Sequence, residues 1–254
     1  MPVSKPNIVK GIPVPLIRPL PTLYYFGRFS NGKQSIEASN YFNGTVDYIC
    51  DAIRLLHDQT KDESLLQLNT LCSNLKECAA SDTASCVIDI TTKLSTCCSR
   101  NADKIKGNDA LSKEQFFEIY KSKVAPLKTL LIDNNDEPEK IDRFTNTLTN
   151  TCFFEVLDTK PYADNYIESI NKSDFVIFAS AKPIMINEDV QNIQSYQKPF
   201  IVLAELTKDD AEDQQTLRNG AWLQSKGYEV LYKIFTPLRL FTTIDKMYMK
   251  FHLS

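Results

Sequence analysis

The sequence predicts an α/β fold, in which a mainly parallel sheet is flanked by helices and carries a helical insertion or subdomain. The first observation is that four short apolar runs alternate with helical stretches in the last third of the chain, which is typical of parallel sheets. These runs of strand type are Cys152–Leu157, Phe175–Ala179, Phe200–Leu206 and Tyr228–Phe235. The second observation is a cluster of glycines near the N-terminus, formed by Gly27, Gly32 and Gly44.

The N-terminal elements are expected in the order arm, strand, loop and helix. Residues 1–21 are rich in proline and are expected to form an extended arm. Thr22–Phe26 is a short apolar run that favours a buried strand, and Gly27–Gly32 follows it as a loop. Gln34–Phe42 is expected to be a helix that ends near Gly44, because glycine is favoured at helix C-termini.

The middle of the chain has the periodicity of helices. Apolar residues follow the i, i+3, i+4 spacing over much of residues 46–140, and Ser112 and Gln115 have the spacing of a capping box. The acidic stretch Asp133–Asp142 is expected to be a solvated turn. We therefore interpret residues 46–140 as a helical insertion within one domain that spans residues 22–254.

Composition narrows the function classes. The net charge of -3 and the pI of about 5.5 provide no basic field, so nucleic acid is not expected as a partner. No apolar run approaches the roughly 18 residues of a membrane-spanning helix. No secretion signal precedes the 7 cysteines, so we expect a cytoplasmic protein with reduced thiols. Zinc is not expected, because there is no C-x-x-C pair and the only histidines are His57 and His252.

Residues 27–35 provide the first candidate site, a glycine loop of the form G-x-x-x-x-G-K. Such a loop wraps backbone N–H groups around a phosphate, the next helix adds its dipole, and the lysine pairs with the β- and γ-phosphates. A hydroxyl after the lysine normally holds Mg²⁺, but here a glutamine takes that place and a serine follows it. The predicted phosphate-binding residues are Gly27, Asn31, Gly32, Lys33, Gln34 and Ser35.

Two further segments follow runs of strand type. Asp158 comes directly after the first run, where an aspartate would reach Mg²⁺ through a water molecule. Thr207, Lys208 and Asp210 follow the third run in the pattern [NT]-K-x-D. In that pattern the aspartate accepts two hydrogen bonds from guanine, and the stem of the lysine packs along the base. The alternative is a charged loop whose aspartate caps a helix.

With these three segments in this order, the chain resembles the P-loop GTPases, and within them the dynamin-related and immunity-related GTPases. The resemblance covers about residues 22–45 and 150–250. It implies that the glycine loop and Lys33 cradle GTP or GDP, that Asp158 lies near Mg²⁺, and that the T-K-x-D segment reads guanine.

The chain departs from the pattern of these GTPases in three places. Gln34 stands at the magnesium position, and Pro161 replaces the glycine whose N–H senses the γ-phosphate. No threonine stands clearly at the switch position, for which Thr145, Thr147 and Thr149 are candidates. Hydrolysis depends on these metal and phosphate contacts, so the departures predict weak hydrolysis or none.

The expected function is therefore that of a guanine-nucleotide-binding switch or pseudo-GTPase, which acts through a protein partner or as a homodimer. One alternative is an active dynamin-like or immunity-related GTPase that self-assembles and is peripheral to a membrane. Another is a receiver-like signalling module of flavodoxin-like topology that binds no nucleotide. For this alternative, the run YKIFTPLRLF is similar to the Lys-Pro-Phe end of receivers, but the acidic cluster expected after the first strand, Thr22–Phe26, is missing.

Overall fold

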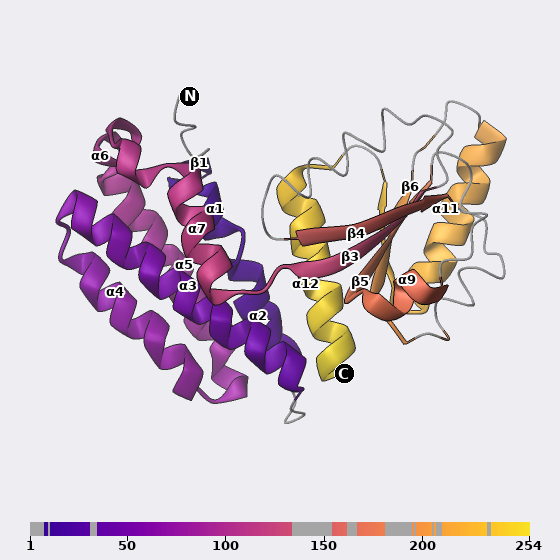
Figure 1. The fold of residues 1–254 in the computed structure, drawn as a ribbon, viewed down its shortest axis with the longest axis horizontal. Helices are drawn as coiled ribbons and strands as arrows, with labels where there is room; N and C mark the ends of the chain where they lie inside the picture. Colours follow the sequence, from indigo (N-terminus) through magenta and orange to yellow (C-terminus); the bar gives the residue numbers. More distant parts are fainter. Residues whose placement is uncertain are drawn as a thin grey trace. The chain divides into compact units, whose positions relative to one another are not determined.

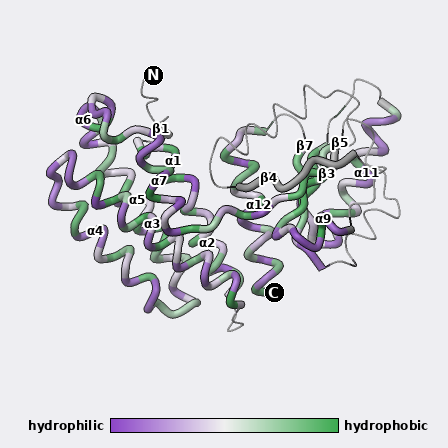
Figure 2. The backbone as a smooth tube through the Cα atoms, in the orientation of Figure 1, coloured by the Kyte–Doolittle hydropathy of each residue, from purple (hydrophilic) through white to green (hydrophobic). Residues whose placement is uncertain are grey.

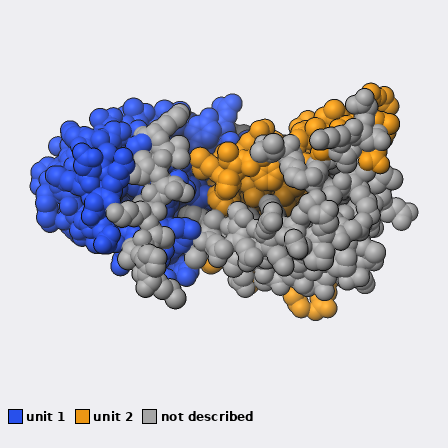
Figure 3. Space-filling view, turned by 90° about the horizontal axis from the view of Figure 1, so that it is seen from above, with its two compact units in different colours: residues 1–125, 252–254 blue, residues 126–251 orange. Residues whose placement is uncertain are grey.

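The chain divides into two compact units (Figure 3). The helical unit comprises residues 1–125 and 252–254, and the sheet unit comprises residues 126–251. The computed structural model describes residues 8–9, 11–30, 35–133, 154–161, 167–180, 195, 197–204, 206, 210–232 and 235–254. None of the helices among these residues is long and apolar enough to cross a membrane.

The helical unit is built from packed helices and one short antiparallel hairpin (Figure 1). Helix α3 packs against α4 and α7, and α5 packs against α2 and α4. The elements of this unit are β1 (Ile8–Val9), β2 (Ile12–Pro13), α1 (Val14–Ile17), α2 (Leu20–Phe29), α3 (Ile36–Thr60), α4 (Ser64–Ser73), η1 (Asn74–Glu77), α5 (Ala80–Arg100), α6 (Ala102–Gly107), η2 (Asp109–Leu111) and α7 (Lys113–Lys123).

Apolar spacing and capping side chains explain the long helices of this unit. Helix α3 has one face of fully buried residues at helical spacing, which includes Val46, Ile49 and Ile53. The predicted capping box before α7 is confirmed at its first residue, because Ser112 Oγ accepts a hydrogen bond from Gln115 N at 3.3 Å. In Figure 2 the helices alternate between hydrophobic and hydrophilic colours, as amphipathic helices do.

Two N-terminal predictions are wrong. Thr22–Phe26 lies inside α2 and forms no strand, and α3 continues past Gly44 to Thr60. Close packing against neighbouring helices explains why glycine occupies positions 27 and 44. A Cβ on Gly27 would lie 2.6 Å from Ala84 N, and one on Gly44 would lie 2.5 Å from Lys123 O. These glycines therefore let neighbouring backbones approach, and they end no element.

Part of the segment expected to be an extended arm, residues 1–21, has regular structure. It contains the β1–β2 hairpin, helix α1 and the start of α2. Leu16 is fully buried, and the hydroxyl of Tyr48 donates a hydrogen bond to the carbonyl of Pro15 at 2.8 Å. This segment is consequently part of the packed helical unit.

One carboxylate ties the turn between α3 and α4 to the end of α5. Asp62 accepts hydrogen bonds from Asn101 Nδ2 at 2.6 Å, from Arg100 Nη2 at 2.8 Å and from Ser64 N at 3.0 Å. Burial raises the pKa of this carboxyl, but the hydrogen bonds from Ser64, Asn101 and Arg100 outweigh burial and lower the pKa to about 2. The ionised carboxylate therefore joins three segments of the helical unit.

The described residues of the sheet unit form a parallel sheet of five strands in the order β4-β3-β5-β6-β7 (Figure 1). The predicted α/β fold with a parallel sheet is confirmed in this unit. Its elements are β3 (Leu127–Asp133), β4 (Phe154–Pro161), α9 (Ile167–Lys172), β5 (Phe175–Ser180), β6 (Phe200–Ala204), α11 (Asp210–Ser225), β7 (Glu229–Tyr232) and α12 (Pro237–Leu253).

Strand β3 corrects the predicted helical insertion of residues 46–140. Leu130, Leu131 and Ile132 are all fully buried, so both faces of this strand are covered. A short continuous apolar run of this kind has no period that separates a buried strand from a buried helix. Among the described residues of this segment, the helices therefore extend to α7, and the sheet begins at residue 127.

Aromatic side chains pack together within the core on one face of the sheet. Phe200 of β6 stacks on Tyr228 with ring centroids 4.1 Å apart, and it meets Phe178 of β5 edge to face at 5.9 Å. Ile170 of α9 and Leu223 of α11 belong to the same buried cluster, so both helices cover this face. On the opposite face the alternate strand residues are also buried, and they include Leu131, Ile177, Ile201 and Leu231.

Candidate functional site

The predicted phosphate site falls in the helical unit and lacks the strand that it requires. Gly27 lies in the last turn of α2, so a helix and not a strand precedes the loop. Ser35 is the N-cap of α3, where its Oγ accepts a hydrogen bond from Ala38 N at 3.2 Å. The remaining predicted residues lie outside the described part of the chain: Asn31, Gly32, Lys33 and Gln34.

The other predicted site residues belong to the sheet unit. Asp158 lies within β4, opposite Leu130, one residue after the register between β3 and β4 shifts. The strand does not end at Leu157 as predicted but continues to Pro161. Asp210 is the first residue of α11. Outside the described residues lie Thr207 and Lys208, as well as the candidate switch threonines Thr145, Thr147 and Thr149.

Strand order identifies a different candidate site, at the carboxyl edge of the sheet between β3 and β5. The chain adds β4 on one side of β3 and then crosses to add β5 on the other side. The connections after β3 and β5 therefore leave in opposite directions, and open α/β sheets bind ligands in the crevice at such a switch point. Asp133 ends β3 and is paired in register with Ala179 of β5.

The residues at and after the end of β3 are of types that carry ligand oxygens, and the sequence analysis did not use them. Asp133 is followed in the sequence by Asn134, Asn135 and Asp136, and carboxylate and amide oxygens suit hard divalent cations. In the sequence, this acidic segment follows the first strand of the sheet, which is where an acidic cluster was expected for a receiver-like domain. It was missed because the first strand was predicted at Thr22–Phe26, whereas the first strand of the sheet is β3.

The neighbouring strand ends in residues without carboxylates. β5 ends at Ala179 and Ser180, and β6 ends at Ala204. Among the described residues there is no group of three His, Cys, Asp or Glu side chains that could hold a metal ion. Among the described residues at the ends of β3 and β5, Asp133 is therefore the one whose type carries a carboxylate.

Comparison of the chain with protein-family models, curated proteins and solved structures finds no match.

Proposed function

We propose that the sheet unit is a receiver-like regulatory domain that acts by binding a protein partner and does not turn over a nucleotide. The observation that carries this proposal is the strand order β4-β3-β5-β6-β7. Numbered by their order in the chain, the strands follow the sequence 2-1-3-4-5, which is the doubly wound order of flavodoxin-like and receiver-like domains. Fold alone does not define function, so the site must carry the rest of the argument.

The residues at the switch point favour binding over phosphoryl transfer. Transfer to a protein carboxylate requires an acceptor and a metal ion held beside it by further oxygen ligands. The Asp133 end of β3 offers oxygen ligands, but Ala179 and Ser180 at the end of β5 offer no carboxylate to accept a phosphoryl group. A domain of this kind would act by binding its protein partner and would not be phosphorylated on β5.

Guanine-nucleotide binding is the second proposal, and one observation favours it. The segment Thr207–Asp210 joins the carboxyl end of β6 to the start of α11, on the same edge of the sheet as the switch point. A guanine-reading motif would occupy such a connection. The helix at Leu20–Phe29 weighs against this proposal, because a phosphate-binding glycine loop follows a strand.

Thermal unfolding with different ligands separates the two proposals. We expect Mg²⁺ to raise the melting temperature of the wild type, and we expect Asp133→Asn to abolish this shift. Asp103→Asn removes the same charge from exposed helix α6 and should keep the shift. A ligand whose concentration is a hundredfold above its Kd raises the free energy of unfolding by about 2.7 kcal/mol, so even modest binding gives a measurable shift in melting temperature.

The nucleotide arm uses GDP and GTP with Mg²⁺, with ATP as the control, in the wild type and in Lys33→Ala. A shift that is specific for guanine and is lost in Lys33→Ala would overturn the receiver-like proposal in favour of nucleotide binding. Incubation with acetyl phosphate and Mg²⁺, followed by intact-mass measurement, tests phosphorylation directly. A phosphoryl adduct in the wild type would contradict the proposal that the domain acts by binding alone.

A further inference from the structure

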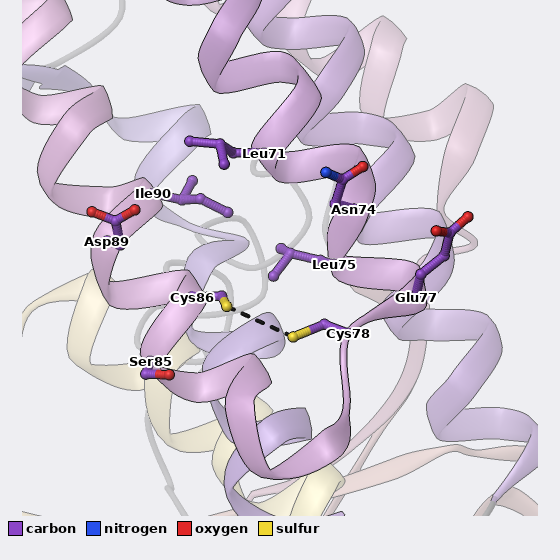
Figure 4. Close-up of a pocket in the computed structure, with 9 residues that line it drawn as sticks. All are labelled: Leu71, Asn74, Leu75, Glu77, Cys78, Ser85, Cys86, Asp89 and Ile90. Carbon is purple, nitrogen blue, oxygen red and sulfur yellow. Dashed lines mark hydrogen bonds between the residues drawn. The ribbon is translucent and has the colours of Figure 1, made fainter.

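Two cysteines of the helical unit face each other across the connection between η1 and α5. The sulfur atoms of Cys78 and Cys86 are 3.6 Å apart (Figure 4). Cys78 is the residue after η1, and Cys86 lies in the second turn of α5. Both thiols are half-buried, whereas Cys50, Cys72 and Cys97 are buried.

Both thiols line a surface pocket with a volume of about 580 Å³. Its apolar wall is formed by Leu71, Leu75 and Ile90, and Figure 4 shows the two sulfur atoms pointing toward each other below this wall. A pocket of this size admits a small molecule to the sulfur atoms. The pair is therefore accessible as well as close.

The charged side chains around the pocket do not exclude an uncharged reagent. Glu77 and Asp89 are the charged residues of the lining, and Asp89 is paired with Lys93 at 2.6 Å. Carboxylates would repel an anionic disulfide such as oxidised glutathione, but they have little effect on hydrogen peroxide, which carries no charge. The pocket therefore suits a small neutral oxidant.

The two thiols are not equivalent. The hydrogen bond to Cys78 is the largest influence that raises the pKa of Cys86, followed by burial and by the nearby carboxylates of Asp82 and Asp89. The raised pKa makes Cys86 the weaker candidate for the attacking thiolate, which leaves that role to Cys78.

We propose that Cys78 and Cys86 form a reversible oxidation site for hydrogen peroxide. The thiolate of Cys78 attacks one peroxide oxygen, the O–O bond breaks, and water leaves after the second oxygen takes a proton, which gives a sulfenic acid on Cys78. The sulfur of Cys86 loses its proton and attacks the sulfur of this sulfenic acid. An S–S bond forms and the hydroxyl leaves with that proton as water, so two thiols and one peroxide give one disulfide and two waters.

The local backbone allows this bond to form. The sulfur atoms must approach from 3.6 Å to the bonded distance of about 2.05 Å. Cys78 has an extended backbone, with φ -71° and ψ 139°, in the short connection between η1 and α5. Because Cys78 lies outside α5, rotation of its side chain can bring its sulfur toward Cys86.

A metal site is a weaker explanation for the pair. A structural zinc ion takes four ligands from the protein, and two thiolates supply half of them. Across the part of the chain that the structure describes, no third His, Cys, Asp or Glu is grouped with Cys78 and Cys86 as a ligand set. Oxidation needs only the two sulfurs and the oxidant.

Brief exposure of the full-length protein to hydrogen peroxide, followed by differential alkylation and peptide mass mapping, tests the proposal. We expect a disulfide that links Cys78 to Cys86 and is reversed by dithiothreitol. Modification of the buried Cys72 should be slower by about tenfold or more, because the thiol is inaccessible. If Cys78 and Cys86 remain fully alkylatable while other thiols oxidise, the proposal is overturned.

Single variants test the order of the two steps. In Cys86→Ser, the sulfenic acid on Cys78 has no resolving thiol, so dimedone should trap it. In Cys78→Ser, dimedone labelling of Cys86 should be weaker than that of Cys78 in Cys86→Ser, because burial and the carboxylates of Asp82 and Asp89 still raise the pKa of Cys86. Stronger labelling of Cys86 than of Cys78 would contradict the assigned roles. If peroxide treatment gives no dimedone labelling in either variant, the proposed oxidation site is contradicted. Circular dichroism checks that each variant is folded.

Discussion

The substitution Gly27→Ala distinguishes a helix-packing glycine from a phosphate-loop glycine. Helices α2 and α5 cross so closely that a Cβ on Gly27 would lie 2.6 Å from Ala84 N and 2.7 Å from Thr83 Cβ. Ordinary carbon contacts are about 3.5–4.0 Å, so the two helices would have to separate by about 1 Å. The atoms in the way are mostly backbone and β-carbon atoms, which cannot rotate aside.

The expected magnitude follows from two opposing terms. Alanine is better than glycine in a helix by about 1 kcal/mol. Overpacking typically costs about 1–3 kcal/mol, and a clash with backbone belongs at the upper end of that range. We therefore expect Gly27→Ala to lower the free energy of unfolding by about 1–2 kcal/mol. In an open loop the same change would be neutral or stabilising.

Urea unfolding monitored by far-ultraviolet circular dichroism measures this difference. Gly107→Ala is the matched control, because Gly107 is the last residue of α6 and a Cβ there would meet nothing within 4 Å. This control should be as stable as the wild type or more stable by up to about 1 kcal/mol. A Gly27→Ala protein at least as stable as the wild type would refute the close crossing of α2 and α5.

The other predictions concern one polar contact and one core. Asp62→Asn should lower the free energy of unfolding by about 1 kcal/mol at pH 7 after allowance for screening. This deficit should shrink as the pH falls from about 5 through the folded pKa of about 2, because the wild-type carboxylate becomes protonated over that range. Urea titrations across this range measure the deficit, and a deficit unchanged at pH 2 would contradict the charge argument. Phe200→Ala should lower the free energy of unfolding of the sheet unit by about 3–5 kcal/mol, because the side chain is fully buried. Unfolding of this unit can be monitored by the fluorescence of the single tryptophan, Trp222. Leu217→Ala is the control, because this side chain on α11 is 45% exposed, and it should lower the free energy of unfolding by less than about 0.5 kcal/mol. Equal losses of stability in the two variants would contradict the burial of Phe200.

The sequence predicted the fold well where a regular pattern extended over many residues, and poorly where a single short apolar run had to be assigned. The alternation of strands and helices after residue 150 predicted the parallel sheet, because buried parallel strands form continuous apolar runs. The run at Leu127–Asp133 has the same character, and Pro126 directly before it marks a helix break that the sequence analysis did not use. Its assignment to the helical insertion removed an interior strand of the sheet and hid Asp133 as a site residue.

The glycine motif shows a different limit of sequence reasoning. Gly27 and Gly44 were interpreted as turn residues, because glycine tolerates unusual backbone angles. Glycine also lacks a side chain, and the structure uses that property where α2 meets α5 and where α3 meets the end of α7. A single sequence does not separate these two uses, because the neighbouring backbone that requires the glycine is distant in the chain.

The strand order also has a consequence for biosynthesis. Translation delivers the helical unit up to residue 125 before β3, so locally connected helices can form early. β3 is the first strand of the parallel sheet to appear, yet it pairs on both sides, with β4 and with β5. Until these partners emerge, a strand with an apolar centre has open edges, which is the condition under which nascent chains associate wrongly. The interval between the synthesis of β3 and that of β5 is therefore when this protein should depend most on chaperones.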